Sequence, residues 1–172
     1  MARTKWKTLG TTLCMALCFP LSAAANPALS PAKPTPGDIP KVNYLGERIR
    51  GFPLPAAVAF RQPDGEITGL YGYIVGKRDG TSNYAFWNKS VGVECHGKTQ
   101  SNEEGYRVGE IICTDKDRTF MRGPFVVVPE KYKNLKGDVR ATLDTPEGAQ
   151  IRVNLAWRMG RFPKLNDLLA DL

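Results

Sequence analysis

The residue types best suited to nucleophilic chemistry meet in one stretch of the chain. The segment VGVECHGKTQSNEEGYRVGEIICTD, residues 91–115, contains Cys95, the only histidine, His96, and Cys113. A thiolate nucleophile needs a base within hydrogen-bonding reach, whereas adjacent residues on a β-strand point to opposite faces of the sheet. If SVGVECHG is a strand, Cys95 points inward with Val93 and His96 points outward. The pattern therefore predicts no Cys–His catalytic pair.

The two cysteines are instead predicted to form a disulfide. Cys113 alternates in step with Ile111, so it also points inward and faces Cys95 across neighbouring strands. A bridge closing a loop of this size is expected to stabilise the fold by about 3 kcal/mol.

Other reactive constellations are incomplete. A single histidine leaves most zinc sites and Ser–His–Asp triads without ligands or a base. Asp115 and Asp117 begin like a calcium-binding loop, but the required glycine and later glutamate are missing, so TDKDR is interpreted as a turn. No pair of acids stands out for glycoside hydrolysis. We therefore expect no metal, no cofactor and no enzymatic activity, and a carboxylate-based hydrolase is the lowest-ranked alternative.

The elements that hold these residues are predicted to be short β-strands. In AQIRVNLAWRM (149–159) and DVRATLDT (138–145), apolar side chains alternate with others, and turn sequences rich in Pro, Asp, Asn and Gly separate the runs. The glycines of EITGLYGYIVG (66–76) indicate sharp curvature. We predict an all-β fold, an antiparallel meander of seven to nine strands that closes into a small barrel or sandwich. Leucines spaced as on a helix predict a short C-terminal helix over residues 163–172.

The first 25 residues have the pattern of a secretory signal peptide. Arg3, Lys5 and Lys7 precede an apolar run from Leu9 to Leu21, and small residues ending at Ala25 follow it. The run is too short and too polar for a membrane-spanning anchor, so none is expected after cleavage. These features predict export to the periplasm or the outside of the cell.

Removal of this segment changes both the charge and the cysteine content. The full chain has 24 basic and 17 acidic residues, and the first 25 residues include three basic and no acidic ones, so the net charge falls from +7 to +4. That charge is too small for a nucleic-acid-binding surface. Only Cys95 and Cys113 remain, which favours a disulfide in an oxidising compartment. Residues 26–42 contain five prolines and are predicted to form a linker or disordered arm before a β domain at 43–172.

A basic loop is the candidate partner-binding site. PEKYKNLKG (129–137) places Lys131, Lys133 and Lys136 around Tyr132, a composition suited to an anionic protein or glycan surface, although a solvated loop is the alternative. The preferred function is an exported, non-enzymatic envelope protein that binds a protein or glycan, as an inhibitor or accessory factor. A carrier of a small apolar ligand inside the barrel is the first alternative.

The pattern VECHG followed by YRVGEIICTDKD resembles one found in small exported bacterial β-rich proteins. Those proteins have Cys-x-Gly, a polar loop, an apolar strand, and then Cys-[Ser/Thr]-Asp with a turn. The resemblance covers residues 91–118, and Lys116 stands where a glycine usually follows the aspartate. Because those proteins are mostly uncharacterised, the resemblance implies a fold and an exported location and no activity.

Overall fold

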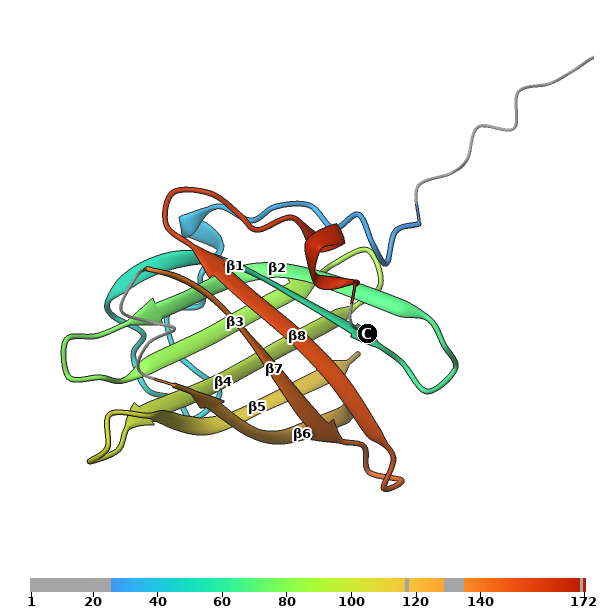
Figure 1. The fold of residues 1–172 in the computed structure, drawn as a ribbon. Helices are drawn as coiled ribbons and strands as arrows, with labels where there is room; N and C mark the ends of the chain where they lie inside the picture. Colours follow the sequence, from blue (N-terminus) through green and yellow to red (C-terminus); the bar gives the residue numbers. More distant parts are fainter. Residues whose placement is uncertain (1–25, 117, 129–134, 171) are drawn as a thin grey trace, which may run out of the picture.

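Eight antiparallel strands follow one another around a closed barrel (Figure 1). The computed structural model describes residues 26–116, 118–128, 135–170 and 172. Each strand pairs with the next in sequence, and β1 pairs with β8 to close the sheet. The strands are β1 (Phe52–Arg61), β2 (Ile67–Gly76), β3 (Ser82–Asn88), β4 (Val93–Ser101), β5 (Arg107–Asp115), β6 (Arg118–Val127), β7 (Lys136–Asp144) and β8 (Gln150–Arg158). The predicted all-β antiparallel meander is confirmed, and it closes as a barrel.

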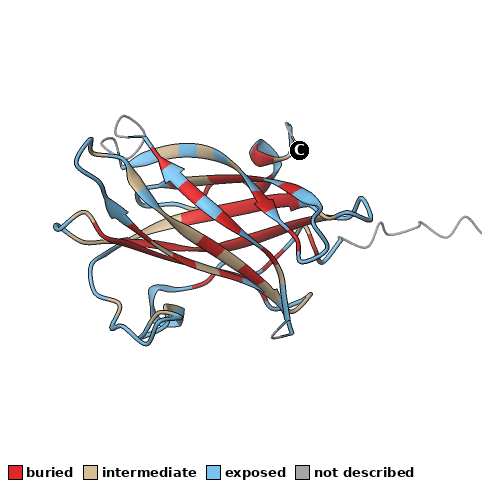
Figure 2. Ribbon diagram, turned by 90° about the horizontal axis from the view of Figure 1, so that it is seen from below, coloured by how far each residue is buried: buried red, intermediate tan, exposed pale blue. Residues whose placement is uncertain are grey.

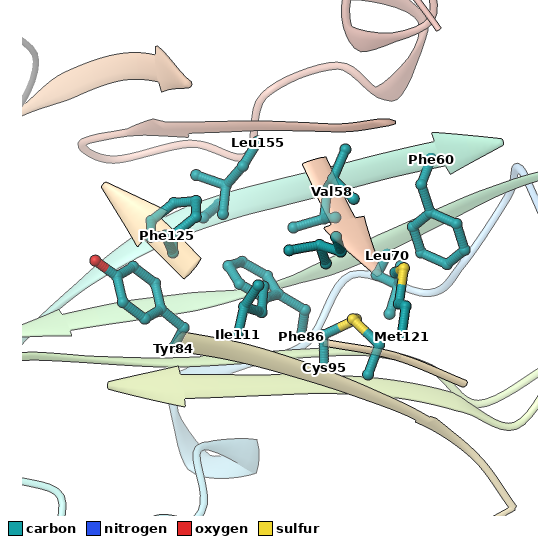
Figure 3. Packing of buried hydrophobic residues seen from close by; sticks show 14 of the residues in the cluster. Val58, Phe60, Leu70, Tyr84, Phe86, Cys95, Ile111, Met121, Phe125 and Leu155 are labelled. Atoms are coloured by element: carbon teal, nitrogen blue, oxygen red, sulfur yellow. A yellow bond between two sulfur atoms is a disulfide. The ribbon is translucent and has the colours of Figure 1, made fainter. Parts of the chain in front are cut away.

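Every second side chain along a strand points inward, and these inward side chains fill the middle of the barrel. Figure 2 shows buried and exposed positions following one another along the strands, as expected where one face meets the core and the other meets water. The inward side chains include Phe86, Phe125 and Leu155, each about 1% exposed, and they pack together from different sides of the barrel (Figure 3). Burying each such side chain stabilises the fold by about 2 kcal/mol.

Gly72 lies where β2 and β3 approach each other closely. It shares the inward alternation of Leu70 and Ile74, and a Cβ there would lie 1.9 Å from the carbonyl oxygen of Ala85 on β3. Only a residue without a side chain permits so close an approach between strands. The glycine at position 72 is therefore explained by this close approach, and the register of β2 with both neighbouring strands continues through it.

Strands β1, β2 and β3 are buried on both faces because the two ends of the described chain cover their outer side (Figure 1). On the N-terminal side, which contains the 3-10 turn η1 (Pro36–Asp38), the hydroxyl of Tyr73 donates to the carbonyl oxygen of Pro34 at 3.0 Å. The backbone N–H of Gly69 donates to the carbonyl oxygen of Ala28 at 2.7 Å, and Ala28 is 1% exposed. Residues 26–42, for which the composition predicts a linker or disordered arm, thus lie against the barrel.

The C-terminal helix is shorter than the leucine spacing predicts. In the described part of this segment, 163–170 and 172, only η2 (Leu165–Leu168) is helical, and it is a 3-10 helix. Leu165 and Leu168 are buried against Ala57 and Ala59 on the outer face of β1, where small side chains leave room for them. No helix in the described ranges is long and apolar enough to cross a membrane.

Candidate functional site

Cys95 and Cys113 form a disulfide in the core, as predicted. They stand directly opposite each other in the β4–β5 ladder, with an S–S distance of 2.01 Å, and both are almost fully buried. The bridge occupies both thiols, so neither is available as a nucleophile. A disulfide in this position indicates a non-reducing environment.

His96 points to the outer face of β4, away from the disulfide, as the alternation predicts. It is half-buried because Tyr44, from the segment that precedes β1, stacks on it with ring centroids 5.6 Å apart. Burial lowers the pKa of His96, and the nearby Glu94 carboxylate opposes this shift in part. An ion pair of 2.7 Å between Lys98 and Glu47 holds the same segment in place. His96 therefore serves as a packing surface for this segment.

One end of the barrel contains a pocket of about 230 Å³, which we call the mouth pocket. At this end β2, β4 and β6 finish and β3, β5 and β7 begin. Most of its described lining is apolar and comes from four strands and one loop residue: Phe52, Leu54, Ile74, Val127, Trp157 and Leu135. Figure 3 shows Tyr84, which also lines this pocket, beside Phe125 at one end of the core cluster. The mouth pocket is thus continuous with the apolar interior.

Hydroxyl and guanidinium groups of β3, β4 and β5 form one side of this end of the barrel. Nη1 of Arg107 donates to Oγ of Ser82 at 2.5 Å, and the hydroxyls of Tyr84 and Thr99 share a hydrogen bond of 2.9 Å. Ser82 and Thr99 stand directly opposite each other in the β3–β4 ladder. We call Ser82, Tyr84, Thr99 and Arg107 the polar wall. It faces the apolar side chains that β1 and β8 contribute.

Burial controls the ionisation of Tyr84. Desolvation raises its pKa to about 12, although Thr99 and Arg107 oppose the shift. The phenol therefore stays protonated at neutral pH and keeps its hydrogen-bonding proton.

The charged residues in the described lining of the mouth pocket are all basic. Lys77 and Arg78, from the turn between β2 and β3, join Arg107 in the lining, and none of the described lining residues is acidic. These three cationic groups of the described lining contribute a positive potential at the opening.

The predicted partner-binding loop is placed only in part. Lys131, Tyr132 and Lys133 lie outside the described residues, and Lys136 is exposed as the first residue of β7, at the end of the barrel that holds the mouth pocket. That prediction therefore remains a proposal.

Sequence reasoning missed the polar wall, although one signal for it was present. Cys113 and Ile111 are correctly predicted to point inward. By the same two-residue period, Gly109 and Arg107, nearer the start of the strand, also lie on the inward face. An arginine on the inward face of a barrel strand is the signal that would have identified this site.

Two acids also line a cleft on the outside of the barrel, beside the seam between β6 and β7. Within the described residues these strands share a single register pair, Arg122 with Asp144, and the cleft beside it includes Glu110 and Asp144. Nη2 of Arg122 lies 2.6 Å from Oε1 of Glu110. Within this cleft, Arg122 therefore engages the Glu110 carboxylate directly.

Across the described ranges, no group of three or more His, Cys, Asp or Glu side chains is arranged to hold a metal ion. Asp117, half of the aspartate pair in TDKDR, lies outside those ranges. Comparison with protein-family models, curated proteins and solved structures finds no match for this chain.

Proposed function

We propose that this protein is a non-enzymatic binding protein that holds a small, mainly apolar molecule in the mouth pocket. The observation that carries the proposal is the pocket of about 230 Å³ at one end of an otherwise packed barrel. Eight-stranded barrels are wide enough to hold one small ligand, and ligand pockets are typically apolar with a few polar groups that fix orientation.

The size of the pocket limits the ligand. An engineered apolar cavity of about 150 Å³ binds benzene, so by proportion the mouth pocket accepts about nine non-hydrogen atoms. Larger molecules would have to extend out of the opening into solvent.

Gly76 offers a direct test. It lines the pocket, and a Cβ there would make only ordinary contacts, 3.7 Å from Oγ of Ser82 and 3.8 Å from Nη1 of Arg107. Gly76→Leu should therefore fill the pocket without displacing the backbone. We expect calorimetric titration to detect 1-octanol binding to the unmodified protein, and Gly76→Leu to weaken it at least tenfold.

The control for this test is Gly76→Ala, which adds one methyl group and should retain most of the binding. Unfolding midpoints of both variants establish that they are folded. Equal binding by Gly76→Leu and the unmodified protein, or no binding to either, would overturn the proposal.

We propose protein or glycan binding as a second function, supported by an apolar strip on the outer face of β5 and β6. Val108 and Val126 stand directly opposite each other and are 42% and 44% exposed, and Tyr106 and Val128 extend the strip. Neighbouring exposed apolar side chains are typical of interaction surfaces. The basic segment predicted from the sequence, 129–137, follows Val128 directly in the chain.

This second proposal is tested by capture of partners from cell-envelope extract. Proteins retained by the unmodified chain are identified and compared with those retained by Val108→Glu with Val126→Glu. A parallel variant replaces Lys131, Lys133 and Lys136 with glutamate. A partner that binds directly when purified, and is lost in either variant, supports the proposal, whereas identical capture by all three proteins contradicts it.

We also propose that the protein is exported. The basic and apolar pattern of residues 1–25 and the buried disulfide support this location. Cell fractionation and N-terminal sequencing should find a chain that starts at Asn26 in the periplasm or the medium. An uncut chain in the cytoplasm would contradict this.

A further inference from the structure

We infer that the ligand of the mouth pocket carries a carboxylate, which Arg107 recognises while a short apolar chain packs against the opposite side. This inference rests on the proposed ligand-binding function and specifies its chemical class. It follows from three observations: the position of Arg107, the charge of the lining, and the two-sided character of the pocket.

Arg107 is held in a defined orientation at the entrance to the apolar interior. It is the first residue of β5, it is half-buried, and its Nη1 donates to Oγ of Ser82 at 2.5 Å. A planar guanidinium matches a carboxylate with two parallel N–H donors. Because the hydrogen bond to Ser82 already restricts the Arg107 side chain, less side-chain entropy is lost when a ligand binds.

The lining discriminates between charges. Lys77, Arg78 and Arg107 are the charged members of the described lining, so an anion is attracted and an ammonium group is repelled. The interaction is stronger here than in bulk water, because apolar side chains lower the effective dielectric constant around the guanidinium.

The two sides of the pocket orient the ligand. Ser82 and Tyr84 stand beside Arg107 on one side, and Leu54 from β1 and Trp157 from β8 stand on the other. A molecule with one anionic end and one apolar end satisfies both sides in one orientation. The expected ligand is therefore a medium-chain or aryl-substituted carboxylate of about nine non-hydrogen atoms.

Ligands that share one alkyl chain test the head group separately from the pocket. Octanoate, 1-octanol and octylammonium are titrated into the unmodified protein at pH 7 and followed by calorimetry. A charge-assisted hydrogen bond accounts for about a tenfold or larger difference in affinity, so octanoate should bind at least tenfold more tightly than either other probe. Added salt should reduce this preference.

The outcomes separate this inference from the function on which it rests. If octanol or octylammonium binds as tightly as octanoate, the carboxylate assignment is wrong while the apolar pocket stands. If none of the three binds, the proposed function itself is wrong.

Variants assign the preference to a residue. Arg107→Gln should bring octanoate and octanol to within about threefold of each other, chiefly by weakening octanoate. The matched control, Arg152→Gln, removes an exposed arginine from the outer face of β8 and should keep the full preference. An unchanged preference in Arg107→Gln would overturn the role of Arg107. If that variant does not fold, Arg107→Lys can be used instead. It retains the positive charge but lacks the two parallel N–H donors of the guanidinium, so it should lower the preference for octanoate.

Discussion

Replacing Gly72 with alanine is expected to destabilise the barrel by about 3 kcal/mol, because the added methyl group has no space. An ideal Cβ at this position would lie 1.9 Å from the carbonyl oxygen of Ala85 and 2.6 Å from Cα of Phe86. Both are backbone atoms, so no side-chain rotation relieves the contact. Strands β2 and β3 would have to separate by roughly 1 Å before the contact becomes acceptable.

The magnitude follows from the hydrogen bonds that this separation weakens. Gly72 stands opposite Phe86, and the neighbouring register pairs join Tyr71 to Trp87 and Tyr73 to Ala85. Each backbone hydrogen bond contributes about 1 kcal/mol net, and overpacking a filled site adds about 1–3 kcal/mol. The intrinsic advantage of alanine over glycine in a strand, about 0.5–1 kcal/mol, recovers only part of that loss.

Urea unfolding followed by tryptophan fluorescence measures this loss, and Gly76→Ala provides the control within the same strand. A Cβ at Gly76 would make only ordinary contacts, the shortest being 3.7 Å to Oγ of Ser82. Gly76→Ala should therefore be as stable as the unmodified protein or more stable by up to about 1 kcal/mol. Equal midpoints for Gly72→Ala and the unmodified protein, or equal losses in the two variants, would refute the reasoning.

Three further predictions follow from the disulfide and the buried titratable groups. Replacing Cys95 and Cys113 together by alanine should lower the free energy of unfolding by about 3 kcal/mol in urea, and reduction of the unmodified protein should have a similar effect; unchanged stability would contradict this. Because Tyr84 has a pKa of about 12 in the fold against 10 for an ordinary tyrosine, it should contribute about 3 kcal/mol to a fall in stability between those pH values, and Tyr84→Phe should reduce the fall in denaturation curves by about that amount. Because burial lowers the pKa of His96, the unfolded chain takes up its proton first as pH falls below about 6.5, so stability should decrease there. The single histidine resonance should titrate below 6.5 by NMR, and titration at or above that value would exclude this effect.

The parts of the fold predicted best are those with one face in water. Strand β7 alternates between more and less exposed positions, and β8 does so over much of its length, so their period of two is readable from sequence. Strands β1 to β3 lack this alternation because the two ends of the described chain cover their outer face. There the Tyr73 hydroxyl donates to the Pro34 carbonyl oxygen, and Leu165 packs against the small residues of β1. That cover depends on contacts between residues far apart in the chain, which periodicity does not encode. The leucine spacing over 163–172 correctly indicates buried leucines, Leu165 and Leu168, but it does not fix the length of the helix.

The site was less predictable than the fold. Alternation correctly separates Cys95 from His96 and pairs Cys95 with Cys113, because both inferences need only the two-residue period of a strand. The mouth pocket depends instead on which volumes remain unfilled when side chains such as Leu54 and Trp157 meet from opposite ends of the chain. Such a volume depends on side-chain size and on the register between strands, and the sequence of a single strand does not specify that register.

The pairing of β1 with β8 has a consequence for the order in which the protein folds. Every other neighbouring pair in the barrel joins strands that are consecutive in sequence, and these can form by local encounters, whereas Ala56 and Trp157 meet across about one hundred intervening residues. Closing so long a loop is slow, and contacts between distant residues reduce folding rates. Because Leu54 and Trp157 line the mouth pocket from these two strands, the pocket is completed only by this last closure. Binding competence should therefore appear after most of the secondary structure, as the final event on the folding pathway.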